Sequence, residues 1–270
     1  MRSKLLFLPL AALMLSSLGC GKKGCTDPRA SNYDEDANRY DGSCEYDPLV
    51  ENLVIAIQPT IGGQHLLLDE LYTTSDDNTI RVETMKLYLS NLRLVRNDDT
   101  EVSLRDIALF DFDLDNPNTQ LGLDVTPGDY KALRFYLGVP PEMNALDPND
   151  FEASHPLSFD QNMHWDWNSK FIFIKFDGRS DTTGTGTFNH NFAYHCGKDD
   201  FYAEVNHLEF PIAVPNTGSN TITLELDVEK FWAQGADPIN LRTDNSTHTL
   251  NNEPLAEQFL GNVNVAFEVQ

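Results

Sequence analysis

Two short segments concentrate the side chains that could hold a transition metal. The first runs from Met163 to Asn168, reads Met-His-Trp-Asp-Trp-Asn and contains two of the three tryptophans of the chain. The second is Tyr194-His195-Cys196-Gly197. Neutral imidazole is the commonest ligand for transition metals, because its nitrogen is a good donor near neutral pH. The chemistry that these segments offer is metal binding beside a pair of indoles.

Spacing alone does not establish that site. In an extended segment Trp165 and Trp167 point to one face and His164 to the other, and tryptophans beside a strand are more often core residues. A single histidine at a strand end is also more often structural. His195, His164 and His248 are therefore candidate metal ligands that need support beyond their positions in the sequence.

Two further chemistries are open at the level of residue types. A thiolate from Cys196 would be a soft donor that favours cuprous ion, although a buried, inert thiol is the better interpretation. A hydrolase is poorly supported, because the chain contains neither a Gly-x-Ser-x-Gly elbow nor a His-Glu-x-x-His helix. Asp147 and Asp150 lie in an Asp-Pro-Asn-Asp sequence that is typical of a turn. We expect a protein that is not an enzyme.

The elements that must position these side chains are mostly strands. Apolar residues at 222, 224, 226 and 228 alternate with polar ones, a period of two that predicts a strand with one buried face. Similar runs recur between turn signals, which predicts an antiparallel β-sandwich over residues 49–270. A change of phase between Leu89 and Leu92 predicts a bulge. Leu255, Phe259 and Val263 predict one short C-terminal helix, and the irregular stretch Pro140–Asn162 predicts a functional loop.

The amino terminus has the layout of a secretory signal. Residues 1–19 carry Arg2 and Lys4 before an apolar stretch that is too short to span a bilayer as a helix. A small residue followed by Cys20 resembles a lipobox, so we expect lipidation of Cys20 and anchoring of the protein in a membrane of the cell envelope. Lys22 and Lys23 would favour an anionic membrane surface. A plain secreted protein is the alternative.

Residues 20–48 are polar and cannot form a core of their own. In an exported chain, Cys25 and Cys44 are expected to form a disulfide, worth about 3 kcal/mol by loop-closure entropy. The segment resembles a Cys-Thr-Asp-Pro…Asp-Gly-Ser-Cys module of bacterial surface and exported proteins. Four oxygen donors match positions 1, 3, 5 and 12 of a calcium-loop template: Asp34, Asp36, Asn38 and Glu45. Arg39 stands where such a loop needs glycine, so a stapled spacer with Asx turns is the favoured interpretation.

The charge of the chain excludes one class of partner. Its formal net charge is −23, and loss of Arg2 and Lys4 with the signal makes it −25. Phosphate binding requires the opposite sign, so we do not expect nucleic acid as a partner. An acidic surface keeps a protein soluble and attracts cations, including metal ions.

Six motifs in order carry a resemblance to a known family. They span about residues 53–270 and comprise Glu83 to Leu94, Gly128 to Val139, Asn144 to Pro148, Met163 to Asn168, Ile174 to Gly178 and Tyr194 to Gly197. Together they resemble the MbnP family, periplasmic copper-associated proteins related to the methanotroph copper proteins. The usual Ser-Gly-Tyr after the tryptophan motif is Ser169-Lys170-Phe171 here, and Cys196 replaces a common aliphatic residue.

The resemblance implies a β-sandwich that holds one copper ion with histidine nitrogens. It also implies a kynurenine made by oxidising a tryptophan, here Trp165 or Trp167, in a reaction carried out by a dihaem partner of the MbnH type. His195 would be the leading ligand, and His164 or His248 the second. The implied role is storage or transfer of copper. The alternative is a structural or interaction lipoprotein with the same fold and no metal.

Overall fold

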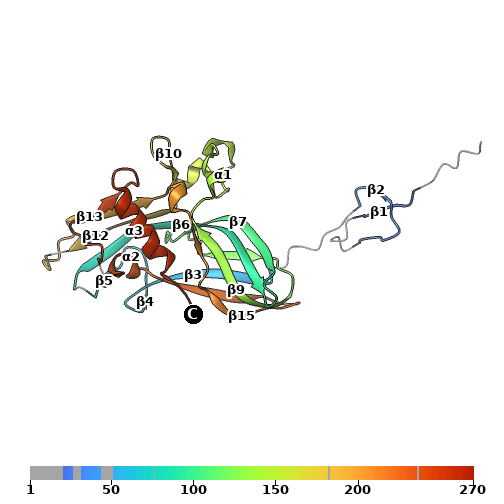
Figure 1. The fold of residues 1–270 in the computed structure, drawn as a ribbon, viewed down its shortest axis with the longest axis horizontal. Helices are drawn as coiled ribbons and strands as arrows, with labels where there is room; N and C mark the ends of the chain where they lie inside the picture. The colour runs from blue at the N-terminus through green and yellow to red at the C-terminus, as the bar shows by residue number, and fades with distance from the viewer. Residues whose placement is uncertain (1–20, 27–31, 44–50, 76, 182, 236) are drawn as a thin grey trace, which may run out of the picture. The chain divides into compact units, whose positions relative to one another are not determined.

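The structure is a computed structural model of the 270-residue chain and describes residues 21–26, 32–43, 51–75, 77–181, 183–235 and 237–270 (Figure 1). The chain divides into two compact units, Met1–Leu49 and Val50–Gln270. The signal segment 1–19, Cys20, Cys44 and Glu45 lie outside the described residues, so lipidation, the disulfide and the complete calcium loop stay predictions. None of the helices in the described ranges is long and apolar enough to cross a membrane.

The described part of the first unit is held by short backbone contacts. Strand β1 (Lys23–Gly24) pairs in parallel with β2 (Arg39–Tyr40). The ammonium of Lys22 lies 2.9 Å from a carboxylate oxygen of Asp34 and 3.3 Å from one of Asp36. The side chain of Asp34 also accepts a hydrogen bond from the backbone N–H of Asp36, which is an Asx turn. Two of the predicted calcium donors, Asp34 and Asp36, thus form ion pairs with the ammonium group of Lys22.

A large mixed sheet forms one layer of the second unit. Its main order is β14-β9-β6-β12-β13-β17, with β15 beside β9 and with β5 and β7 beside β6. The strands are β5 (Leu71–Thr73), β6 (Thr79–Arg96), β7 (Glu101–Asp111), β9 (Gly128–Leu137), β12 (Ile174–Asp181), β13 (His190–Cys196), β14 (Ala203–Val205), β15 (Glu209–Val214) and β17 (Ser246–Thr247).

A second, five-stranded sheet forms the other layer. Its order is β18-β16-β3-β4, with β8 beside β3, and its strands are β3 (Leu53–Ile61), β4 (Gln64–His65), β8 (Gln120–Leu123), β16 (Asn220–Asp227) and β18 (Phe267–Val269). Buried residues of both sheets belong to one hydrophobic core, and the ring of Phe135 on β9 meets that of Phe267 on β18 edge-to-face at 5.1 Å. This arrangement confirms the predicted sandwich.

Two features of the fold differ from the prediction. The pairings β3–β16 and β13–β17 are parallel, so the sheets are mixed rather than purely antiparallel. Parallel neighbours need long crossover connections, which a pattern of alternating residues cannot reveal. The predicted C-terminal helix is present as α3 (Glu253–Asn264), but two four-residue helices, α1 (Pro141–Asn144) and α2 (Lys230–Ala233), accompany it.

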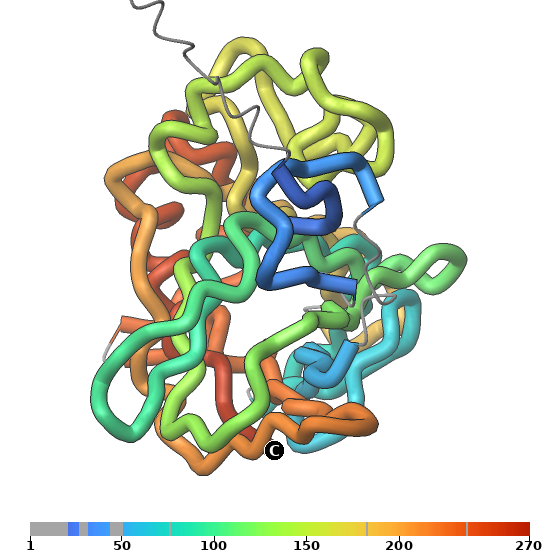
Figure 2. Tube along the Cα trace, turned by 90° about the vertical axis from the view of Figure 1, so that its right-hand side faces the viewer, coloured from blue at the N-terminus to red at the C-terminus, as the bar shows by residue number. Residues whose placement is uncertain are grey.

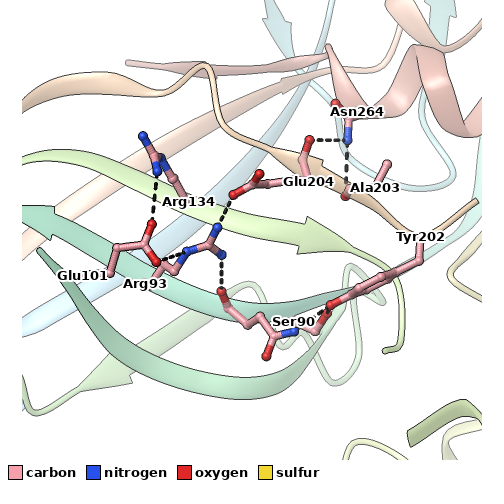
Figure 3. Close-up of polar contacts among 9 residues, drawn as sticks. Ser90, Arg93, Glu101, Arg134, Tyr202, Ala203, Glu204 and Asn264 are labelled. Atoms are coloured by element: carbon pink, nitrogen blue, oxygen red, sulfur yellow. Dashed lines mark hydrogen bonds and ion pairs between the residues drawn. The ribbon is translucent and has the colours of Figure 1, made fainter. Parts of the chain in front are cut away.

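The predicted bulge lies in the middle of β6. Asn91 has a φ of 48°, and the register of β6 with both β7 and β9 shifts between residues 90 and 93. Figure 3 shows the side chain of Arg93 just beyond the bulge, between Glu101 of β7 and Glu204 of β14. The guanidinium therefore connects three strands where their backbone ladder is interrupted.

The predicted long loop is an ordered excursion at one end of the sandwich. Figures 1 and 2 both show the segment 140–171, in yellow-green to yellow, gathered there. It contains α1, the short 3-10 turns Pro148–Asp150 and Phe159–Gln161, and the hairpin of β10 (His164–Trp165) and β11 (Lys170–Phe171). The buried hydroxyl of Tyr88 donates to the carbonyl of Pro156 at 2.7 Å and so fixes the loop to β6.

Candidate metal centre

The tryptophan motif forms the β10–β11 hairpin. Trp165 pairs with Lys170 across it, and residues 166–169 make the turn. Lys170 has a φ of 77°, a conformation that favours glycine because it brings Cβ close to the backbone carbonyl. The position where the family pattern has glycine is thus a left-handed one, and lysine occupies it here at a cost in backbone strain.

His195 is presented by the last residues of β13. Phe192, Tyr194 and Cys196 point into the core, whereas His195 points to the opposite face. The next residue is Gly197, where a Cβ atom would lie 2.4 Å from the carbonyl oxygen of Phe171. The Tyr-His-Cys-Gly sequence therefore combines a buried strand, an outward imidazole and a glycine required by close packing against β11.

His248 comes from a different segment and is held against His195 by its neighbour Thr249. Strand β17 runs parallel to β13, and His248 follows it directly. The fully buried hydroxyl of Thr249 donates to the carbonyl of His195 at 3.2 Å and accepts from the N–H of Gly197 at 3.0 Å. The backbone N–H of His248 donates to Asn251 at 2.7 Å. These hydrogen bonds fix the loop that carries His248 without using the imidazole of His248.

The rings of these segments meet beside one indole. The centres of the His195 and His248 rings are 4.9 Å apart, and the planes of the rings are inclined by 81°. The ring of Trp165 lies 6.0 Å from that of His195 and 5.9 Å from that of His248. Trp167 stacks obliquely on Trp165 at 5.6 Å and is 71% exposed. The structure thus brings together two of the three candidate imidazoles and both candidate indoles.

His164 and Cys196 lie elsewhere. The ring of His164 packs edge-on against Phe171 at 4.8 Å, and its buried Nδ1, which makes no hydrogen bond, is 3.5 Å from a carboxylate oxygen of Asp166. Cys196 is completely buried on the face of β13 opposite to His195, and burial raises the pKa of its thiol well above the usual value. These positions favour a structural role for both side chains.

The lowered pKa of His248 favours metal binding. Burial lowers the pKa of His248, and the neighbouring His195 lowers it further. The neutral imidazole, which is the form that ligates metals, is therefore the prevalent form of His248 near neutral pH. Within the described ranges, the ring of His248 makes no hydrogen bond that would compete for its nitrogens.

The residues present fit a copper ion of low coordination number. Bonds of about 2 Å from one nitrogen of each ring are compatible with ring centres 4.9 Å apart, and imidazole suits copper. Among the residues that the structure describes, no three His, Cys, Asp or Glu side chains form a group that could hold a metal. His195 and His248 are the imidazoles whose geometry could hold such an ion, beside Trp165.

Comparison with known proteins agrees with the motifs. The model of the MbnP family matches residues 50–251. The chain belongs to the MbnP family. Family membership associates it, in broad terms, with copper-related proteins. Among solved structures, MbnP from Methylosinus trichosporium is similar with 16% sequence identity and a TM-score of 0.47, covering 69% of this chain and 78% of that one. No curated protein matches.

The structure adds Asp177 to this MbnP site. The sequence alone assigned no role to this residue. The Nε2 atom of His195 lies 2.7 Å from the Oδ1 atom of Asp177 on the neighbouring strand β12. Asp177 belongs to the Ile174–Gly178 motif, so the sequence singled out the segment. Its contact with His195 depends on the register between β12 and β13, which no pattern within one strand specifies.

Proposed function

We propose that this protein is an exported copper-binding protein that holds one copper ion between His195 and His248 beside Trp165. The observation that carries the proposal is the convergence of these imidazoles from β13 and from the loop after β17, with 4.9 Å between ring centres. The acidic chain, with a net charge of −23, attracts cations to the surface. The proposed role is storage or transfer of copper, with no catalysis.

Copper stoichiometry of purified protein tests this proposal. Wild type loaded anaerobically with cuprous ion is expected to retain one equivalent after desalting, and His195→Ala and His248→Ala are expected to lose it. His65→Ala, which alters an exposed histidine of β4, is the matched control. His164→Ala should retain the metal, because its ring packs on Phe171 rather than against the pair. Retention of copper by both His195→Ala and His248→Ala would refute the assignment.

The alternative is a metal-free structural lipoprotein of the cell envelope. The observation that favours it is that only two of the candidate ligands, His195 and His248, lie together, while His164 packs against Phe171 and Cys196 is buried on the opposite face of β13. A wild-type protein that leaves the desalting column without copper, and whose thermal unfolding is unchanged by copper, would favour this alternative. Stabilisation by bound metal distinguishes the two functions because a ligand that binds only the folded state raises its stability.

We propose Trp165, rather than Trp167, as the precursor of a kynurenine. Trp165 contacts both imidazoles, whereas Trp167 is 71% exposed. A dihaem partner of the MbnH type would use two molecules of hydrogen peroxide to remove four electrons from the indole. The C2–C3 bond of the five-membered ring breaks, each of these carbons gains one oxygen, and two waters leave, which gives formylkynurenine. Hydrolysis then releases formate. Trp167 is exposed, and the centre of its ring lies 5.6 Å from that of Trp165. It would therefore connect such a partner with Trp165.

Intact mass tests this modification. Co-production with the partner is expected to replace one carbon of the protein by one oxygen, and Trp165→Phe should abolish the change. Trp167→Phe should slow it without abolishing it. A peptide map that places the modification on Trp167 would refute the assignment.

We also propose that Cys20 carries the lipid anchor in the cell envelope. The support is the lipobox-like sequence before it, since Cys20 lies outside the described residues. Cys20→Ser is expected to move the protein from the membrane fraction to the soluble one. Membrane association that survives this substitution would refute the proposal.

A further inference from the structure

The register of two strands places a carboxylate beside the candidate ligand His195. In the antiparallel pair β12–β13, Lys175 lies opposite His195 and Asp177 opposite Ala193. Residues two apart on a strand share a face, so Asp177 is the diagonal neighbour of His195 on the outer face of the sheet. Strand β12 also pairs with β6 on its other side, and the register of that pairing shifts between Asp177 and Gly178. Such a bulge changes the direction of the adjacent side chain.

Gly178 is required for this local geometry. A Cβ atom there would lie 2.3 Å from the carbonyl oxygen of Arg81 and 2.3 Å from the ring of Phe192. The Asp177-Gly178 pair therefore combines a position that only glycine can occupy with an adjacent carboxylate directed along the sheet face.

The contact between His195 and Asp177 determines which nitrogen of the imidazole carries the hydrogen. The Nε2 atom of His195 and the Oδ1 atom of Asp177 are 2.7 Å apart, and their side chains are only 15% and 24% exposed. An ionised carboxylate can only accept hydrogen bonds, so the nitrogen that faces it must carry the hydrogen. In a neutral imidazole the other nitrogen then holds the lone pair. That nitrogen is Nδ1, which has no hydrogen bond in the described structure.

We infer that Asp177 is a positioning residue that fixes His195 in its Nε2–H tautomer and so presents Nδ1 to the metal. This inference rests on the proposed copper site and deepens it. A carboxylate behind a metal-ligating imidazole raises the basicity of the ligand and fixes the ring orientation, and loss of such a partner typically weakens metal binding about 10–100-fold. Asp177 acts through His195 and does not itself touch the metal.

The tautomer of the metal-free protein is the first test. Nitrogen chemical shifts of the histidine side chains, assigned by comparison with His195→Ala, are expected to show hydrogen on Nε2 of His195 in wild type. Asp177→Ala is expected to show a mixture of the two tautomers. Hydrogen on Nδ1 in wild type would overturn the inference, and this result is decisive even if Asp177→Ala does not fold.

Copper affinity is the second test. In competition with a chromophoric cuprous chelator, Asp177→Ala should bind copper about 10–100-fold more weakly than wild type. Asp111→Ala is the matched control, because Asp111 also forms one ion pair, with Lys86 at 2.6 Å, but contacts no histidine. Equal affinities of wild type and Asp177→Ala would overturn the inference. If wild type binds no copper, the proposed function fails, whereas the tautomer measurement still decides the role of Asp177.

Discussion

Thr249→Val is the most informative single substitution for the architecture of the site. The hydroxyl of Thr249 is fully buried, donates to the carbonyl of His195 and accepts from the N–H of Gly197. Valine has nearly the same shape and the same branching at Cβ. The left-handed backbone of this position, with a φ of 60°, is therefore equally strained in both proteins. The substitution removes two hydrogen bonds and changes little else.

The expected loss of stability follows from the two backbone groups that lose their hydrogen-bond partner. A buried polar group without a partner costs about 1–3 kcal/mol. The N–H of Gly197 and the carbonyl of His195 would both lose the hydroxyl of Thr249 as partner, and a carbonyl with two lone pairs tolerates this better than a buried N–H does. We therefore expect Thr249→Val to lower the free energy of unfolding by about 2–3 kcal/mol, measured by urea denaturation of the metal-free protein.

The matched control is Thr249→Ser, which keeps the hydroxyl and removes only the methyl group. It is expected to lose about 1 kcal/mol or less, since one buried methyl group is removed. Copper affinity should fall in Thr249→Val and not in Thr249→Ser, because the hydroxyl holds the loop of His248 against β13. Equal stability of wild type and Thr249→Val would refute the argument that this hydroxyl fixes the loop.

Three further substitutions test individual elements by denaturation. Lys170→Gly should stabilise the protein by about 1 kcal/mol, because glycine relieves the left-handed strain of the turn; a loss of stability would contradict this. Arg93→Met should cost about 2 kcal/mol, since it leaves the carboxylate of Glu204 without its cation and that of Glu101 with Arg134 alone; urea curves matching wild type would exclude that role. Burial raises the pKa of Asp181, but hydrogen bonds from Thr183 and neighbouring N–H groups outweigh it and lower the pKa to about 2. Its stabilising contribution is thus present above pH 4 and lost between about pH 4 and 2, so Asp181→Asn and wild type should converge in stability over that interval.

The sequence was sufficient for the type of fold because burial imposes a period on each strand. Alternation from residue 221 to 228 predicted β16, and the change of phase between Leu89 and Leu92 predicted the bulge of β6. The parallel pairing of β3 with β16 could not be predicted, since their 8 paired positions join residues far apart in the chain. A one-residue change of register would leave each pattern intact and invert the faces.

The same limit applies to the site. The motifs identified the tryptophan pair and His195, and left His164 and His248 as alternatives for the histidine beside it. That choice depends on the parallel bridge between β13 and β17 and on the hydroxyl of Thr249. The Asp177 contact depends on the diagonal register of β12 against β13. Family likeness indicated the segments, and only backbone pairing showed which side chains of those segments meet.

The proposed copper ion would bind a site that is already formed and would not be needed to fold the domain. The imidazole of His195 is fixed by Asp177, the loop of His248 by Thr249, and the hairpin by the side-chain amide of Asn168, which donates to the carbonyl of His248. None of these bonds uses a metal, and the core beneath them is apolar and continuous. Metal should therefore stabilise the protein only by mass action on the folded state. The metal-free protein should unfold cooperatively, unlike small domains whose folding free energy is supplied by the ion.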